Sequence, residues 1–352
     1  MTPIQLAQDS LYTLCSNLTS RRNTTKIHGD TRRACVAIII RWRRGQYDRT
    51  PIDGSKKAQN WLEFIQDKMV QRDGGYPEVL YIRRAKRSGD PWSGDMAFPG
   101  GRNEAGETDQ DTVVREVREE VGLDLDSDDY VKLGCLDDRE LTSLLGGKPI
   151  MILSTFVYLQ VAPESPQITR QNSEVAATYW IPLHHFLNTK IHISSPIKLP
   201  VLPLSPKLPS VFGTVAMPSM IVPVKEENIV LWGLALTMTS ELVSYTQNTK
   251  EIARHGHVVP LVRMTKAYPK LSQWDLDGFV RLFCFASTGW RVLNGGYHSK
   301  ISTSWAGGPS IPDYYGSVRR ALYVVTALRA TAGLTAGGFL AHRIIKAAYG
   351  RS

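Results

Sequence analysis

Three glutamates in the first half of the chain have the spacing needed to bind a cation together. Glu116, Glu119 and Glu120 stand at i, i+3 and i+4, so on a helix their carboxylates share one edge. Like charges at this spacing destabilise a helix unless something compensates them. Carboxylate oxygens are the ligands that Mg²⁺ and Mn²⁺ prefer. The spacing therefore predicts a divalent metal site, and the alternative is a solvated acidic helix face.

The residues around this triplet predict a helix over 109–121. Val114, Val117 and Val121 recur at i, i+3 and i+7 and make one apolar stripe. Gly122 follows where a C′ glycine ends a helix. Asp109 and Asp111 lie in the first turn, where the helix dipole favours negative charge.

Two further features indicate how the carboxylates are positioned. Arg115 precedes Glu119 by four residues and can reach back to Glu107, so we expect these two side chains to brace the preceding loop on the helix. Gly100 and Gly101 permit the sharp entry that brings backbone close to a ligand.

The spacing from Gly101 to Leu123 resembles the signature of the Nudix hydrolases. It reads Gx5Ex7REUxEExGU, where U is aliphatic, and every specified position is filled, including Gly101, Glu107 and Gly122. The resemblance implies an α/β/α sandwich around a mixed sheet. It also implies metal-dependent hydrolysis of a nucleoside diphosphate linked to another moiety. Glu116 and Glu120 would then be the principal Mg²⁺ or Mn²⁺ ligands and Glu119 a third ligand or a base, with Arg115 beside them in the catalytic group.

The stretch before the signature resembles the coenzyme A diphosphatase-like subgroup. Gly94 and Phe98–Gly101 match its Gx3FPGG ending, and residues 174–183 and 229–238 resemble other segments of it. The chain departs from the subgroup's extended motif, because Asp90 stands where an arginine is expected and Ile82 begins the stretch where LLT is expected. Nucleotide sugars and dinucleotides are the alternative substrates.

Candidate substrate-binding residues lie on both sides of the signature. Arg83, Arg84 and Arg87 form a basic cluster that could meet phosphates, or could be an exposed strand end. Glu174 precedes a strand that we expect on the far side of the sheet from the signature. It is a candidate base outside the signature, with a structural turn carboxylate as the alternative.

A second class of function is a Nudix-fold module that binds a ligand without turnover. The complete set of Glu116, Glu119, Glu120 and Arg115 favours the enzyme, because a binding module has no need to keep all four.

Composition and the N-terminal sequence indicate the kind of compartment in which the protein works. The four cysteines are far apart and form no CxxC pair, which favours neither a zinc site nor a disulfide framework and suits a reducing compartment. The N-terminus lacks the pattern of a secretory signal. We therefore expect an intracellular protein, and the sequence does not separate mitochondrial, peroxisomal and cytoplasmic locations.

The basic excess belongs to the C-terminal third. Residues 248–352 hold 14 Lys/Arg and 4 Asp/Glu, whereas the rest holds 28 and 29. No nucleic-acid motif accompanies this charge, so we expect no nucleic-acid partner. Residues 321–341 contain Gly333 and Gly337 in a GxxxG pattern but also Arg329, which favours an interfacial or core helix over a spanning one. Contact with a membrane surface is an expectation, and the oligomeric state is undetermined.

The predicted organisation has three parts. Residues 1–33 are expected to be poorly structured, 34–247 to form the Nudix hydrolase domain, and 248–352 to form a basic, mostly helical or irregular extension. Strands are expected at 35–42, 78–85, 93–101, 130–136, 149–161 and 177–183, and helices at 61–70, 109–121, 184–187 and 228–245. The proline-rich stretch 195–224 is expected to be an irregular excursion.

Overall fold

The computed structural model describes most of residues 3–246 and scattered positions beyond them. The described residues are 3–20, 26–27, 31–45, 58–66, 74–88, 93–142, 149–162, 164–187, 197–200, 214–217, 219–224, 227–246, 275, 278–279, 281–283, 285–286, 320–321, 323–329, 331–335, 337–339 and 343. The chain divides into two compact units, one of Met1–Ile197 with Met217–Thr265 and the other of Lys198–Ala216 with Lys266–Ser352. The first unit contains the residues with the Nudix signature.

A mixed sheet forms the centre of the first unit. Its main path runs β3 (Met96–Ala97), β2 (Tyr76–Arg84), β1 (Arg33–Arg43), β7 (Pro149–Gln160) and β5 (Tyr130–Cys135). Three strands pair off this path: β4 (Gly100–Arg102) with β1, β6 (Arg139–Thr142) with β7, and β8 (Val175–Pro182) with β2. β1 and β7 are parallel and the other described pairs are antiparallel. β1 is a central strand, since β2 and β7 pair with its two edges. Its apolar run is buried on both faces of the sheet, as expected for a strand covered on both sides.

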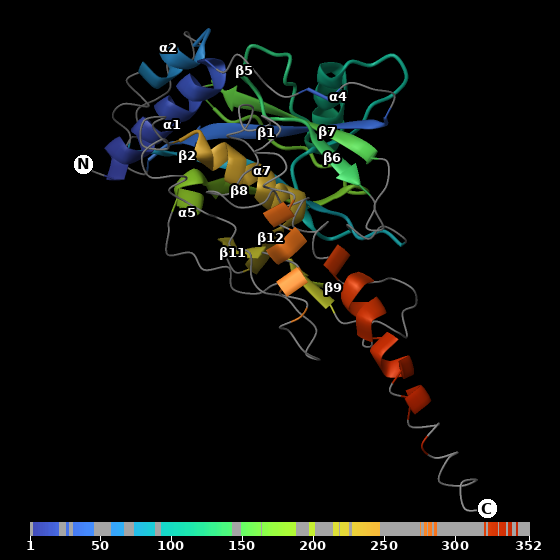
Figure 1. Cartoon of the computed structure of the whole chain (residues 1–352). Helices are drawn as coiled ribbons and strands as arrows, with labels where there is room; N and C mark the ends of the chain where they lie inside the picture. Colours follow the sequence, from blue (N-terminus) through green and yellow to red (C-terminus); the bar gives the residue numbers. More distant parts are fainter. Residues whose placement is uncertain are drawn as a thin grey trace, which may run out of the picture. The chain divides into compact units, whose positions relative to one another are not determined.

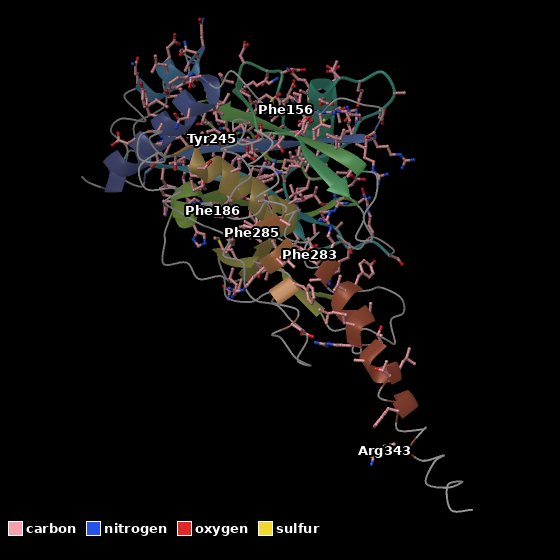
Figure 2. The ribbon with its side chains drawn as sticks, viewed as in Figure 1. Phe156, Phe186, Tyr245, Phe283, Phe285 and Arg343 are labelled. Atoms are coloured by element: carbon pink, nitrogen blue, oxygen red, sulfur yellow. The ribbon has the colours of Figure 1, made fainter. Side chains whose placement is uncertain are left out.

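Helices cover both faces of this sheet (Figure 1). α4 (Asp109–Val121) packs its valines on one face, in a core that includes Ile39, Leu80 and Phe156. On the other face Tyr81 donates or accepts a 2.7 Å hydrogen bond with Thr239 of α7 (Gly233–Ser244), and its ring contacts Phe186 of α5 (Leu183–Leu187). Figure 2 labels Phe156 of β7, which lies in the core beneath α4, and Phe186 of α5 on the other face. The predicted α/β/α sandwich is confirmed.

The expectation that residues 1–33 are poorly structured is wrong for 3–20. α1 (Pro3–Ser20) buries four side chains on one face, Leu11, Leu14, Cys15 and Leu18. Asn17 also donates a 2.8 Å hydrogen bond to the carbonyl of Tyr245, just after α7. The spacing 11, 14, 15, 18 is that of an amphipathic helix, and the polar residues between these positions masked it in the sequence.

Two other expectations need correction. Residues 195–224 are not wholly irregular, because β9 (Ile197–Pro200) pairs with β10 (Thr214–Met217), and β11 (Ser219–Val224) pairs with β12 (Glu227–Trp232). The helix expected over 228–245 begins only at Gly233, because its first residues form β12 instead. Gly233 has φ 60°, a left-handed conformation that separates the strand from the helix.

The remaining predicted elements lie close to their expected positions. The helix at 109–121 has the predicted bounds, and the strands at 35–42, 78–85, 130–136, 149–161 and 177–183 match β1, β2, β5, β7 and β8. α2 (Trp61–Gln66) covers the first part of the helix expected at 61–70, whose last residues lie outside the described ones. All described positions between 275 and 343 are helical.

Candidate active site

The candidate site is built where β4 leads into α4. Thr108 caps the helix: its side chain accepts from the backbone N–H of Asp111, whose carboxylate accepts from the backbone of Thr108. Gly122 ends the helix in a left-handed conformation with φ 74°. This capping box and C′ glycine define where α4 starts and stops, so the signature glutamates have a fixed place on it.

Two glycines let the carboxylates approach the backbone. Gly100 has φ 144°, and a Cβ there would lie within 3.0 Å of the Cys35 carbonyl in β1. A Cβ at Gly101 would lie within 3.0 Å of the carboxylate of Glu116. Only glycine leaves room for both contacts, so the double glycine packs Glu116 directly against the loop.

Glu116 and Glu120 form a pair of poorly solvated acids. The side chain of Glu116 is 14% exposed, and Glu120 is 3% exposed, with its Oε2 accepting a 2.8 Å hydrogen bond from the Gly100 N–H. Burial raises the pKa of Glu120 to about 8; the Gly100 N–H opposes this shift and the charge of Glu116 adds to it. Burial also raises the pKa of Glu116. Two such acids side by side fit a divalent cation, which favours their ionised forms.

Glu119 differs from its two neighbours because its side chain is 54% exposed. Its Oε2 accepts a 3.2 Å hydrogen bond from Nη1 of Arg115, with which it forms an ion pair. The three glutamates therefore share a helix edge but not one environment. Across the described parts of the chain, no three His, Cys, Asp or Glu side chains already converge in a geometry that would hold a metal ion.

Arg115 and Glu107 form the expected brace. The Arg115 Nε donates to Oε1 of Glu107 at 2.6 Å, and Nη2 donates to Oε2 at 3.1 Å. Glu107 also accepts hydrogen bonds from the Thr112 hydroxyl and the backbone N–H of Glu104. The hydrogen bond from Arg115, together with these two, lowers the pKa of Glu107 to about 2. Arg115 reaches Oε1 of Glu116 at 3.1 Å with Nη1. One guanidinium thus ties the loop to a buried carboxylate.

The three arginines do not form one cluster. Successive side chains of β2 point to opposite faces of the sheet, which separates Arg83 from Arg84. Arg83 pairs with Glu227 of β12 at 3.0 Å and lies over the ring of Tyr179. The charge of Arg84 instead lowers the pKa of Glu120, so Arg84 lies close enough to act on that carboxylate.

Glu174 lies near the carboxylates, and the expectation that it is separated from them by the sheet is wrong. Its charge raises the pKa of both Glu116 and Glu120. The turn before it is fastened to the end of α4, because the N–H groups of Thr169 and Gln171 donate to the carbonyls of Val121 and Glu120. This contact depends on the pairing of β8 with β2, which sequence spacing does not reveal.

Arg87 holds this turn from the other side. Its Nη2 donates to Oε1 of Glu174 at 2.6 Å and to the carbonyl of Ser173 at 3.0 Å. Arg87 thus forms an ion pair with Glu174, and this ion pair holds the Glu174 carboxylate in place.

Sequence reasoning missed a polar network at the start of α4. Arg33 of β1 donates to Asp109 through Nε and Nη2, at 2.8 and 2.7 Å, and to Asp138 at 2.9 Å. Asn103 and Ser154 also donate to Asp109. Burial raises the pKa of Asp109, but the hydrogen bonds from Arg33, Asn103 and Ser154 outweigh it and hold the pKa at about 2. The helix dipole explanation for Asp109 was therefore incomplete.

Part of the chain is similar to a known protein family and to known proteins. Residues 69–200 match the family model described as NUDIX domain. The chain is 38% identical over 169 residues to the uncharacterized protein C14C4.10c of Schizosaccharomyces pombe, covering 47% of this chain and 46% of that protein. It is 34% identical over 122 residues to the mitochondrial coenzyme A diphosphatase NUDT8 of Homo sapiens, covering 33% and 46%. The matches thus span about half the length of these two relatives.

A shorter match and two solved structures complete the comparison. The ADP-ribose pyrophosphatase of Methanocaldococcus jannaschii is 42% identical over 57 residues, covering 16% of this chain and 30% of the relative. A solved structure of a MutT/nudix family protein from Enterococcus faecalis is similar with a TM-score of 0.30 and 11% identity, and the match covers 60% of this chain and 55% of that protein. An Ap4A hydrolase of C. elegans has a TM-score of 0.29 and 15% identity, covering 44% and 82%.

Residues 69–200 match the NUDIX domain model, so this part of the chain is similar to the Nudix family. The signature from Gly101 to Leu123 lies inside the matched residues.

Proposed function

We propose that this chain is a metal-dependent pyrophosphohydrolase that cleaves the diphosphate of a nucleoside diphosphate derivative. The observation that carries the proposal is a pair of poorly solvated acids at the Gly100–Gly101 backbone, in which Glu120 is buried and Glu116 is half-buried. A protein that only needed this fold would be more stable without two neighbouring acids in a poorly solvated site. The relatives with printed activities, a coenzyme A diphosphatase and an ADP-ribose pyrophosphatase, support the reaction class.

The residues fit Mg²⁺ or Mn²⁺. Glu116 and Glu120 would be the principal ligands, and the exposed carboxylate of Glu119 is available as a third ligand or as a base. A bound divalent ion would lower the pKa of a water and screen the charge of the diphosphate. Glu120 must give up its proton to act as a ligand, because its pKa of about 8 leaves it largely protonated at neutral pH in the metal-free chain.

The other side chains position these groups and the substrate. Arg115 and Glu107 hold the loop on α4, so that Gly100 keeps its N–H on Glu120. Arg84 supplies positive charge close to Glu120 and is the arginine that we assign to a substrate phosphate. Glu174, held by Arg87, lies where it can orient a water or accept a proton. Catalysis would then consist mainly of positioning and charge stabilisation.

We propose coenzyme A or a derivative as the substrate. The identity of 34% over 122 residues to the human coenzyme A diphosphatase supports this choice, as does the FPGG stretch at Phe98–Gly101. ADP-ribose, other nucleotide sugars and dinucleotides are the competing substrates, and the match to the ADP-ribose pyrophosphatase favours the first of these.

A substrate panel tests both levels of the proposal. The full chain is incubated with coenzyme A, ADP-ribose and a diadenosine polyphosphate, each with Mg²⁺, Mn²⁺ or chelator. We expect metal-dependent cleavage, with coenzyme A giving the highest kcat/KM. Glu120→Gln should lower kcat by at least about 100-fold, since a ligand and a charge are lost. The exposed loop residue Glu104 provides the matched control, and Glu104→Gln should retain wild-type activity.

Three outcomes would contradict parts of the proposal. Cleavage of none of these diphosphates under any condition would favour a binding module without turnover. Glu120→Gln as fast as wild type would remove the ligand assignment. A higher kcat/KM for ADP-ribose than for coenzyme A would leave the reaction class intact and change the substrate.

A further inference from the structure

Exposed apolar side chains gather in the second unit. Among the described residues nine large apolar side chains are exposed, and six of them lie between 282 and 339: Leu282, Phe285, Tyr323, Leu328, Leu334 and Phe339. The five most exposed of the nine are all in this group, with Leu334 at 78% and Phe285 at 77%. Large apolar side chains exposed in such number within one unit indicate an interaction site.

The described residues between 320 and 343 are all helical, and this helical segment changes its surroundings along its length. Ala321 and Val325 are buried, whereas every described residue from Thr326 onward is exposed. A helix exposed on all sides is normally polar, with charged residues around it. In this segment leucine and phenylalanine side chains are exposed to solvent, so the segment is more apolar than a fully exposed helix normally is.

The large side chains share one side of the helical segment. On a helical wheel with about 100° between successive residues, the sequence spacing puts Tyr323, Leu328, Leu334 and Phe339 within a sector of about 160°. Arg329 and Arg343 fall outside that sector, whereas Arg320, at the start of the segment, falls inside it. Figure 2 labels Arg343, the last described residue of the segment. The segment therefore has a broad apolar side, which among the described arginines only Arg320, at its first position, shares.

The charge around the helical segment has one sign. Residues 314–352 contain six Lys/Arg and no Asp/Glu. Arg329 pairs with Asp275 through Nη2 at 2.8 Å, so the one arginine inside the apolar stretch is matched by a carboxylate of its own unit. The other cations stand at the ends, with Arg319 and Arg320 before the stretch and Arg343, Lys346 and Arg351 after it.

We propose that the helical segment 320–343 docks on the surface of an anionic lipid membrane. The apolar sector would enter the boundary between headgroups and acyl chains, and the terminal arginines and lysine would contact acidic headgroups. Charge selects this occupant, because a second copy of the chain would bring the same positive charge to the contact. Within the described residues no helix is long and apolar enough to span a membrane, which agrees with docking on the surface. This inference does not depend on the proposed hydrolase activity.

Vesicle co-sedimentation of the full chain tests the proposal. We expect binding to vesicles of phosphatidylcholine with phosphatidylserine, and at least tenfold weaker binding to phosphatidylcholine alone. Added salt should weaken the binding, since it screens the headgroup charge. Leu334→Ser with Phe339→Ser should reduce binding at least tenfold, and Arg343→Glu should reduce it on acidic vesicles only.

Leu62 provides the matched control, because it is an exposed leucine of α2 in the first unit, and Leu62→Ser should bind like wild type. Circular dichroism of each variant checks that it is folded. The proposal is overturned if the full chain binds neither kind of vesicle, or if the Leu62 variant loses as much binding as the double variant. Light scattering adds one more contrary result: self-association that the double variant abolishes, without vesicle binding, would identify a second copy as the occupant.

Discussion

The site depends on single residues whose size matters as much as their charge. A Cβ at Gly101 would clash with the Glu116 carboxylate, and the Gly100 N–H donates to Glu120, so both acids depend on close approach to this backbone. Glu119, one residue from Glu120 in sequence, is largely in solvent. Neighbouring carboxylates of one helix edge therefore have different proton affinities and different roles, and the roles follow from burial.

Gly101→Ala tests this dependence on size. A Cβ at this position would lie within 3.0 Å of the Glu116 carboxylate, so the carboxylate or the loop must shift. We expect kcat to fall by about 100-fold, as for a misplacement of about 1 Å in a catalytic group. Steady-state kinetics on the best substrate of the panel measures the effect.

Gly333→Ala is the control for Gly101→Ala, because a Cβ at Gly333 meets no atom within 4 Å. It should leave hydrolysis unchanged. Full activity of Gly101→Ala would show that the contact between the glycine backbone and Glu116 is not needed.

Helix α4 is held at both ends by other elements. At its start Asp109 accepts from Arg33 of β1 and from Asn103 in the loop. At its end the turn with Thr169 and Gln171 donates to its last carbonyls. An apolar stripe alone leaves a helix able to slide or rotate on a sheet, whereas these polar contacts select one position.

Asp109→Asn should weaken the first of these anchors. The folded-state pKa of Asp109 is about 2, below the ordinary value of 3.8, so its ionised form stabilises the fold above about pH 4. That stabilisation is lost as the pH falls from about 4 to about 2. We expect Asp109→Asn to lower the free energy of unfolding at pH 7 by about 2 kcal/mol, since charged hydrogen bonds to a partly buried group are lost.

Urea denaturation at pH 7 and pH 3 measures the Asp109 effect. The difference between wild type and Asp109→Asn should shrink at the lower pH. Asp128→Asn, at an exposed position of the loop after α4, is the control and should match wild type. An equal difference at both pH values would assign the loss to packing and not to charge.

At the scale of the whole molecule, the folding unit exceeds the segment that matches the family. The NUDIX model matches residues 69–200, but β1 (Arg33–Arg43) lies outside it and pairs with β2, β4 and β7. Thr239 of α7 also lies outside and hydrogen-bonds Tyr81 of β2. The sheet loses its central strand and the cover of one face if these parts are removed.

A fragment of residues 69–200 should therefore fail to fold. It would expose the edges of β2 and β7, which are hydrogen-bonded to β1 in the full chain. A fragment of residues 1–265, which includes all of the first unit, should keep a cooperative unfolding transition and the hydrolase activity. Thermal denaturation followed by circular dichroism compares the two fragments. Cooperative unfolding of the 69–200 fragment at the temperature of the full chain would contradict this expectation.

The sequence by itself determined the chemistry and the local structure of the site. The bounds of the helix at 109–121, its cap at Gly122 and the pair of Arg115 with Glu107 all depend on residues close in sequence. Such contacts follow from helical spacing, from capping preferences and from the reach of one side chain. The five long strands could be predicted for the same reason, because apolar runs of this length have few other uses.

Only the tertiary structure decided which distant residues join the site. Arg33 meets Asp109 because β1 is the central strand, and Glu174 approaches Glu116 because β8 pairs with β2. Arg83 and Arg84 are adjacent in sequence, yet the pleat of β2 places them on opposite faces. α1 was missed because its four buried positions have meaning only once a sheet exists to cover them. Pairing order and register are properties of the whole sheet, so no single segment encodes them.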